Sequence, residues 1–154
     1  MSDSLLHKTA LNKAMAICSR REYCTGDIRT KLNSWGVSIG ETEKIIASLV
    51  KENFINDTRY ANAYVKDKLI HNKWGKLKII SHLRAKNIPD EIVKSSIADI
   101  DDENYRKSVK EIISAHRRFI KAKNQYDLKG KLLRFGLSKG FESHLLYDIL
   151  NETD

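Results

Sequence analysis

Two runs of basic residues, each with aromatic residues between the charges, suggest the clearest chemistry in this sequence. The first run lies between residues 66 and 86 and contains a single acid, Asp67. The second lies between residues 117 and 131, where Asp127 is the only acid. Lysine and arginine neutralise phosphates and release the counterions that surround a nucleic acid. An exposed aromatic ring can stack on an unpaired base. The two runs therefore predict a surface that binds a polyanion, with nucleic acid as the first candidate.

The candidate binding residues are side chains of these runs together with one arginine that precedes them: Arg59, Lys66, Lys73, Trp74, Lys76, Lys78, Arg84, Lys86, Arg117, Arg118, Lys121 and Lys123. Trp74 adjoins a glycine and fits a surface or a core position equally well. Phe119 and Tyr126 are expected in the core. Arg59 could contact a partner, or could pair with Asp57 or a neighbouring helix. The alternative interpretation is that both runs are merely solvated helix faces.

Catalytic and metal-binding patterns are not found in the sequence. Asp101, Asp102 and Glu103 are contiguous, whereas metal ligands must converge in space. The five histidines show neither H-x-x-x-H nor H-E-x-x-H spacing, and there is no phosphate-binding glycine loop. Cys18 and Cys24 do not have the spacing of a zinc ligand pair and are interpreted as small apolar fillers. We therefore expect no enzyme activity, no catalytic residue, no cofactor and no metal site.

The composition favours the same class of partner. The chain has 154 residues, a formal charge of +8 and a pI near 9.5, with 41% hydrophobic and 31% charged residues. The start of the chain lacks a basic stretch followed by an apolar run, and no apolar segment approaches the roughly 20 residues that span a bilayer. The sequence therefore predicts a cytoplasmic protein with reduced cysteines and no membrane partner.

A three-fold internal pattern predicts the elements that carry these side chains. An apolar residue, a leucine four positions later, and then a glycine or asparagine before another apolar residue start at Ile28, Ile79 and Leu128, spaced 51 and 49 residues apart. The small residues Gly36, Asn87 and Gly136 favour the left-handed conformation that ends a helix. With one proline and helical periodicity throughout, the pattern predicts an all-α protein. We expect an elongated row of three tandem three-helix repeats, at residues 5–55, 56–100 and 101–152. Thr42 and Asp57 are the expected N-caps of two of the helices.

The order of several short strings resembles the RecX family. FINDTRYA occupies residues 54–61 and is followed by YV at 64–65, KWGKLKI at 73–79 and LRAKNI at 83–88. The family shows Asn/Asp-Asp before Arg-aromatic-Ala, then Tyr-Val, then a glycine with a basic residue before Ile, and Leu-x-x-x-Gly-Ile. Asn87 stands where the family usually has glycine, and His82 where an acid commonly precedes the leucine.

This resemblance implies a non-catalytic regulatory protein of three three-helix repeats. It implies binding along the groove of the RecA filament, with inhibition of the filament's ATP hydrolysis and strand exchange in homologous recombination, DNA repair and the SOS response. Several weak contacts along a filament gain avidity. The expected partners are the RecA filament and non-specific single- or double-stranded DNA, bound by a monomer. Groove blocking and capping of filament growth remain alternatives.

The main rival is a stand-alone, non-specific DNA-binding helical protein. Leu83–Ile97 could form a helix-turn-helix, but its second helix would begin with Pro89-Asp90-Glu91, where the two acids would repel phosphates. A nuclease is a third class and would require turnover that depends on a divalent metal.

Overall fold

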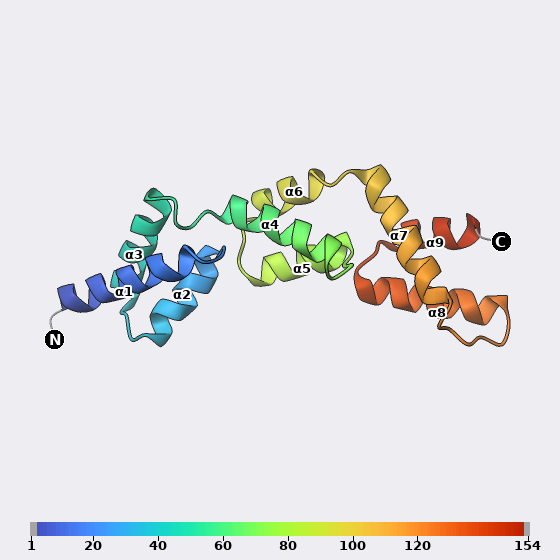
Figure 1. The fold of residues 1–154 in the computed structure, drawn as a ribbon, viewed down its shortest axis with the longest axis horizontal. Helices are drawn as coiled ribbons and strands as arrows, with labels where there is room; N and C mark the ends of the chain where they lie inside the picture. The colour runs from blue at the N-terminus through green and yellow to red at the C-terminus, as the bar shows by residue number, and fades with distance from the viewer. Residues whose placement is uncertain (1–2, 153–154) are drawn as a thin grey trace. The chain divides into compact units, whose positions relative to one another are not determined.

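The computed structural model describes residues 3–152, and these residues form only helices and the turns that join them. The helices run in the order α1 (Asp3–Cys18), α2 (Thr25–Ser34), α3 (Ile39–Lys51), α4 (Asp57–Ile70), α5 (Lys76–Ala85), α6 (Asp90–Ala98), α7 (Asp102–Arg117), α8 (Gln125–Lys139) and α9 (Ser143–Glu152). The predicted all-α fold is confirmed, and the helices succeed one another in triplets, consistent with tandem three-helix repeats (Figure 1).

The chain divides into two compact units, and the boundary runs through the middle triplet. The N-terminal unit comprises the residues up to Tyr64 together with Leu83–Val93. The C-terminal unit comprises Val65–His82 together with the residues from Lys94 onward. One part of α4, α5 and α6 therefore packs with α1–α3, and the other part packs with α7–α9. The three repeat boundaries expected from the sequence stay a prediction.

The N-terminal unit is built on a core that α1, α2 and α3 share (Figure 1). Ile28 and Leu32 of α2 and Ile45 and Leu49 of α3 are fully buried. Their spacing of four residues places each pair on one helix face, which explains why the segments fold as amphipathic helices. Ala10 and Ala14 present the small face of α1 to this core.

The C-terminal unit has its own core between α7, α8 and α9 (Figure 1). Leu132 of α8, Phe141 of the following turn, and Leu146 and Ile149 of α9 are almost completely buried. Tyr105 of α7 lies edge-on to Phe141, with 6.5 Å between the ring centroids. This geometry is favourable for aromatic pairs.

The predicted helix stop is confirmed in two triplets and is wrong in the third. Gly36 and Asn87 have φ of +83° and +62°. Gly136, in contrast, lies inside α8, and the helix ends at Gly140 with φ of +92°. A Cβ on Gly136 would lie 2.5 Å from a methyl group of Leu146. Gly136 is therefore a packing residue, and the third copy of the pattern is displaced by one helical turn.

The three helix ends at Gly36, Asn87 and Gly140 are equivalent, because they share the same hydrogen bond. The N–H after each left-handed residue donates to the carbonyl five positions earlier: Val37 to Leu32, Ile88 to Leu83 and Phe141 to Gly136. These bonds have the pattern of the Schellman motif. Leu137, which the sequence pattern equated with Val37 and Ile88, is 46% exposed instead.

The two predicted caps are also wrong. Ser38 is the N-cap of α3 and accepts from the Glu41 N–H, whereas the hydroxyl of Thr42 is buried without a hydrogen-bond partner. At α4, the side chain of Asn56 accepts from the Arg59 N–H. Asp57 accepts from the N–H of Thr25 at 2.8 Å and so stabilises the start of α2 rather than of its own helix.

Candidate functional site

The segment that carries the first basic run is fixed by a junction of main-chain atoms within the C-terminal unit. The N–H groups of Gly75 and Leu77, at the start of α5, donate to the carbonyls of Lys139 and Gly140 at 2.6 and 3.0 Å. The Lys76 N–H between them donates to the hydroxyl of Tyr105 at 3.0 Å. The end of α8 thus satisfies donors that a helix start leaves unpaired. A Cβ on Gly75 would lie 2.3 Å from the Gly140 carbonyl, so the close approach requires glycine.

Trp74 lies at this junction among several cations. The ammonium groups of Lys68 and Lys78 lie 5.2 and 4.7 Å from centroids of its rings, and the His82 ring lies 4.5 Å away. These distances are typical of cation–π contacts. Trp74 is half-buried. It therefore neither belongs to a closed core nor stands free in solvent.

Lys139 joins this cluster from the end of α8. Its ammonium donates to the carbonyl of Asn72 at 2.9 Å. Burial lowers the pKa of Lys139, and the nearby charge of Lys78 lowers it further. Like charges held close together disfavour the protonated form and favour the approach of an anion. We name Lys68, Trp74, Lys78 and Lys139 the Trp74 cluster.

Lys73 is the exposed residue next to this cluster, and its backbone is unusual. Its φ is +59°, in the left-handed region that few non-glycine residues adopt. The following N–H, that of Trp74, donates to the carbonyl of Lys68 at 3.0 Å. The turn after α4 is thus closed by a hydrogen bond. This hydrogen bond holds the turn in a conformation that leaves Lys73 exposed and Trp74 half-buried.

Four of the predicted binding residues form ion pairs that support the fold. Lys76 contacts Asp102 at 2.7 Å, and Arg84 contacts Asp90 at 3.3 Å. The Lys86 ammonium contacts Asp27 at 2.8 Å, and this pair belongs to the N-terminal unit, as does Arg84–Asp90.

Arg59 is the fourth of these residues and is the most heavily engaged. Its guanidinium donates to Glu22 at 2.8 Å and to the carbonyls of Asn53 and Phe54. A guanidinium is well suited to such a multiple contact because its donors form a rigid fork. Arg59 therefore joins the turn before α2 to the turn after α3.

The Lys86–Asp27 pair has matching effects on both groups. A hydrogen bond to Asp27 raises the pKa of Lys86. Burial alone would raise the pKa of Asp27, but hydrogen bonds from Lys86 and Cys24 outweigh it, so the pKa of the carboxyl is lowered. Both shifts favour the charged forms, which stabilise each other.

In the second basic run, the structure corrects the expectation for the aromatic residues. Phe119 and Tyr126 are 83% and 90% exposed, so the prediction that they lie in the core is wrong. Ile120 and Leu128, one and two positions further along, pack against the core in their place. Ile120 lies directly after Phe119 and reaches the core, whereas Phe119 stays in solvent.

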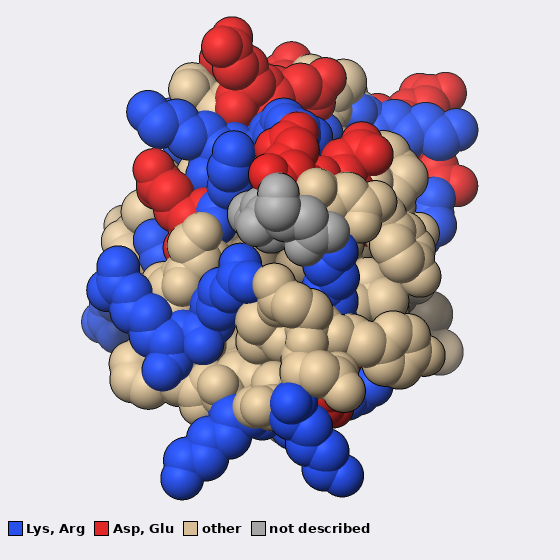
Figure 2. Space-filling model, turned by 90° about the vertical axis from the view of Figure 1, so that its right-hand side faces the viewer, with Lys and Arg blue, Asp and Glu red and all other residues tan. Residues whose placement is uncertain are grey.

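The remaining predicted cations have no acidic partner among residues 5–152. They are Lys66, Lys73, Lys78, Arg117, Arg118, Lys121 and Lys123. All seven belong to the C-terminal unit. In this unit, 17 Lys and Arg less 11 Asp and Glu leave a formal charge of +6, against +2 for the N-terminal unit. Figure 2 shows acidic side chains mainly in the upper part of one face, and basic side chains spread over the whole of it.

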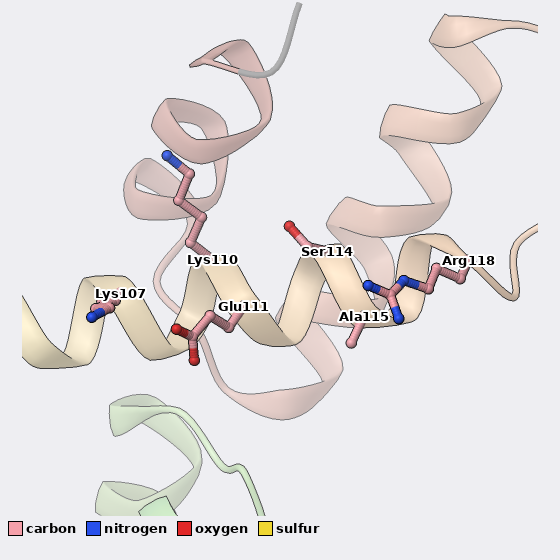
Figure 3. Close-up of a pocket in the computed structure, with 6 residues that line it drawn as sticks. All are labelled: Lys107, Lys110, Glu111, Ser114, Ala115 and Arg118. Atoms are coloured by element: carbon pink, nitrogen blue, oxygen red, sulfur yellow. The ribbon is translucent and has the colours of Figure 1, made fainter.

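Two features of this surface were missed at the level of sequence. Lys139 lies outside both runs, and only its position before the glycine that ends α8 could have linked it to the first run. A shallow hollow of about 480 Å³ follows the outer face of α7 (Figure 3). Its lining includes Lys107, Lys110 and Arg118, with Glu111 as the acid among the lining residues.

Two findings concern other kinds of site. Within residues 3–152, His, Cys, Asp and Glu side chains do not gather in threes as a metal ion would require. None of the helices in this range is both long and apolar enough to cross a bilayer.

Comparison with known proteins places these features in a family. The family domain described as "RecX, second three-helix domain" matches residues 56–96. A Regulatory protein RecX from Clostridium botulinum is 33% identical over 129 residues, which cover 81% of this chain and 59% of that protein. Another from Clostridium acetobutylicum is 30% identical over 149 residues, covering 93% of this chain and 68% of the relative. The chain thus spans less than two thirds of the length of several relatives.

A solved structure agrees in fold. The crystal structure of RecX from Lactobacillus salivarius superposes with a TM-score of 0.83 at 22% identity, covering 95% of each chain. The relatives are named regulatory proteins rather than enzymes. The helices in triplets, the matched second domain and these relatives together show that the chain belongs to the RecX family of regulatory proteins.

Proposed function

We propose that this protein is a cytoplasmic regulator that binds the RecA nucleoprotein filament and limits its ATP hydrolysis and strand exchange. The observation that carries the proposal is the Trp74 cluster with its neighbouring Lys73. Lys73, Lys78 and Lys139 have no acidic partner among residues 5–152, and Lys68 contacts Asp67 at 3.6 Å. All four cations lie in or against the segment that matches the second RecX domain. Cations left without acidic partners at a surface favour association with a polyanion.

The contact surface that we propose is narrower than the full set of basic residues. It comprises the Trp74 cluster together with the neighbouring exposed residues Lys66 and Lys73. Arg59, Lys76, Arg84 and Lys86 are already engaged by acids of the same chain. A partner would have to displace those acids, which costs part of any binding free energy. These four residues act on binding mainly through the fold.

The first test is the single-strand-dependent ATPase of the cognate RecA, with this protein titrated in at fixed salt. We expect the ATPase rate to fall at amounts well below one molecule per recombinase subunit. The double variant Lys73→Glu/Lys78→Glu should inhibit at least about tenfold less strongly, because two charge reversals replace attraction by repulsion at the centre of the surface.

The matched control is Lys8→Glu/Lys51→Glu, which changes the same number of charges in the N-terminal unit, at two exposed positions. We expect it to inhibit like the wild type. If both double variants lose inhibition equally, net charge alone governs binding, and the proposed surface is wrong. If the wild type binds DNA but leaves the ATPase unchanged at any ratio, the protein is the non-specific DNA-binding protein of the rival hypothesis.

A further inference from the structure

The turn between α7 and α8, residues 118–124, and the first turn of α8 leave two aromatic rings and several cations exposed. Phe119 and Tyr126 expose 83% and 90% of their surface. Burying a side chain of this size stabilises a fold by about 1.5–3 kcal/mol. The neighbouring Ile120 and Leu128 pack on the core, so this part of the chain does reach the interior. The fold thus leaves two neighbouring rings in solvent and does not gain the stability that their burial would give.

The backbone around the two rings is held by several hydrogen bonds. The N–H groups of Phe119 and Ile120 donate to the carbonyls of His116 and Arg117. The side chain of Asn124 caps α8 by accepting from the Asp127 N–H at 2.8 Å. The Lys131 ammonium donates to the carbonyl of Lys121 at 2.7 Å. A platform that is already ordered loses little conformational freedom when it binds a ligand.

The charges of this turn are not balanced by acids. Asp127 accepts from the Lys123 N–H at 3.0 Å and contacts the Lys131 ammonium at 3.2 Å. These two contacts lower the pKa of Asp127, with the Lys123 N–H as the larger cause. The single acid of the run is thus engaged by Lys131 and the backbone. The side chains of Arg117, Arg118, Lys121 and Lys123 have no acidic partner among residues 5–152.

Flat exposed rings among cations fit a single-stranded nucleic acid better than other polyanions. A duplex offers phosphates to the cations but keeps its bases stacked on each other. An unpaired strand offers both phosphates and free base faces, and stacking on an aromatic ring is tolerant of sequence. The hollow on α7 ends at Arg118, so cations continue from the turn along the helix (Figure 3).

We propose that the α7–α8 turn and the first turn of α8 bind single-stranded DNA directly, with Phe119 and Tyr126 stacking on bases and Arg118, Lys121 and Lys123 contacting phosphates. This surface lies on a different turn from the Trp74 cluster. The proposal does not depend on regulation of a recombinase, because the DNA contact is made by this chain alone.

The test is fluorescence anisotropy of a labelled 20-nucleotide oligo-dT strand with the protein alone, at fixed salt. Phe119→Ala/Tyr126→Ala should weaken binding by about tenfold or more, since each stacked ring makes a large contribution to single-strand binding. Phe119→Trp/Tyr126→Trp should keep the affinity, whereas Phe119→Leu/Tyr126→Leu should lose it, because leucine is apolar but has no flat face. Binding to a duplex of the same length should change less than twofold.

Tyr147→Ala is the matched control, since this tyrosine of α9 is 53% exposed and lies outside the turn. It should bind oligo-dT like the wild type. All variants should unfold at the temperature of the wild type, because the replaced rings are exposed. The proposal is overturned if Phe119→Ala/Tyr126→Ala binds oligo-dT normally, or if single strand and duplex lose affinity equally. Normal DNA binding with weakened RecA binding would instead assign the rings to a protein contact.

Discussion

Gly36 and Gly140 have the same left-handed backbone but very different surroundings. Their φ values are +83° and +92°. No neighbouring atom would lie within 4 Å of a Cβ on Gly36. A Cβ on Gly140, in contrast, would lie 2.4 Å from the Cβ of Lys78 and 2.6 Å from the backbone nitrogen of Lys78. The two positions therefore separate the conformational role of glycine from its steric role at a junction.

Alanine at the two positions should show this difference. Gly36→Ala should lower the free energy of unfolding by about 1–2 kcal/mol, the usual strain of a left-handed residue with a side chain. Gly140→Ala should lower it by about 2–5 kcal/mol, because the backbone of Lys78 must also shift. Urea denaturation followed by circular dichroism measures both. Equal losses of unfolding free energy would show that the backbone of Lys78 can shift without destabilising the junction.

A second pair of residues tests the core of α5. Leu83 is fully buried and Leu77 is 51% exposed on the same helix. Leu83→Ala should lower the free energy of unfolding by about 2–5 kcal/mol through reduced burial and the cavity that remains. Leu77→Ala should change it by less than about 1 kcal/mol. Denaturant titration of the two variants side by side provides the measurement. A small effect of Leu83→Ala would contradict its place in the core.

At the scale of elements, the N-terminal unit contains a helix contact comparable to that between α8 and α5. A Cβ on Gly26, in the first turn of α2, would lie 2.8 Å from the carbonyl of Lys86, just beyond the end of α5. The Lys86 ammonium then contacts Asp27 of the same first turn. The end of one helix thus meets the start of another in each unit, which places opposite ends of two helix dipoles together.

This ion pair makes the N-terminal unit sensitive to acid. The pKa of Asp27 in the folded protein lies below its ordinary value of 3.8, so its contribution to stability is present above that value and is lost as the pH falls through the folded pKa. The thermal unfolding temperature of the wild type should therefore fall more steeply between about pH 4 and pH 2 than that of Asp27→Asn. Asp90→Asn, at the more exposed pair with Arg84, is the control and should follow the wild type. Identical slopes for wild type and Asp27→Asn would refute the coupling.

Local patterns predicted the helices but not every helix end. Ile28, Leu32, Ile79 and Leu83 are buried as their spacing predicted, because one face of an amphipathic helix must pack. In α8, however, a second glycine, Gly140, follows Gly136 after one helical turn, and each of the two is followed by an apolar residue. Leu146, from the next helix, packs on the first of them, and this contact does not exist within the local sequence.

The candidate site shows the same limit. The basic runs located the charges, but partners such as Asp27 for Lys86 lie 59 residues away in the sequence. Whether a lysine remains available to a ligand depends on such distant acids, and these are placed only when the helices dock. The exposure of Phe119 was mispredicted for a related reason, since Ile120 beside it fills the core.

At the scale of the whole molecule, the positive charge is distributed unevenly. The formal charge is +6 in the C-terminal unit and +2 in the N-terminal unit. Because binding to phosphates releases counterions, the number of cations engaged can be read from the salt dependence of binding. The distribution therefore predicts which charges control that dependence.

Binding to single-stranded DNA should weaken as potassium chloride rises, with a linear plot of log affinity against log salt. Lys121→Ala/Lys123→Ala should reduce the slope by about 1.4, or about 0.7 for each phosphate that is no longer neutralised. Lys8→Ala/Lys51→Ala should leave the slope unchanged, although it removes the same net charge. Anisotropy at several salt concentrations gives all three slopes. Equal reductions would mean that a diffuse field, rather than this surface, binds the strand.

The junction between α8 and α5 depends on main-chain atoms, which every amino acid carries. Gly75 and Leu77 donate, and Lys139 and Gly140 accept, through groups that most substitutions leave in place. We therefore expect most side-chain substitutions around the junction to leave its geometry unchanged. At Gly75 and Gly140 the junction requires the space that any side chain would fill. At Leu77 it requires only the backbone N–H, which proline alone would remove.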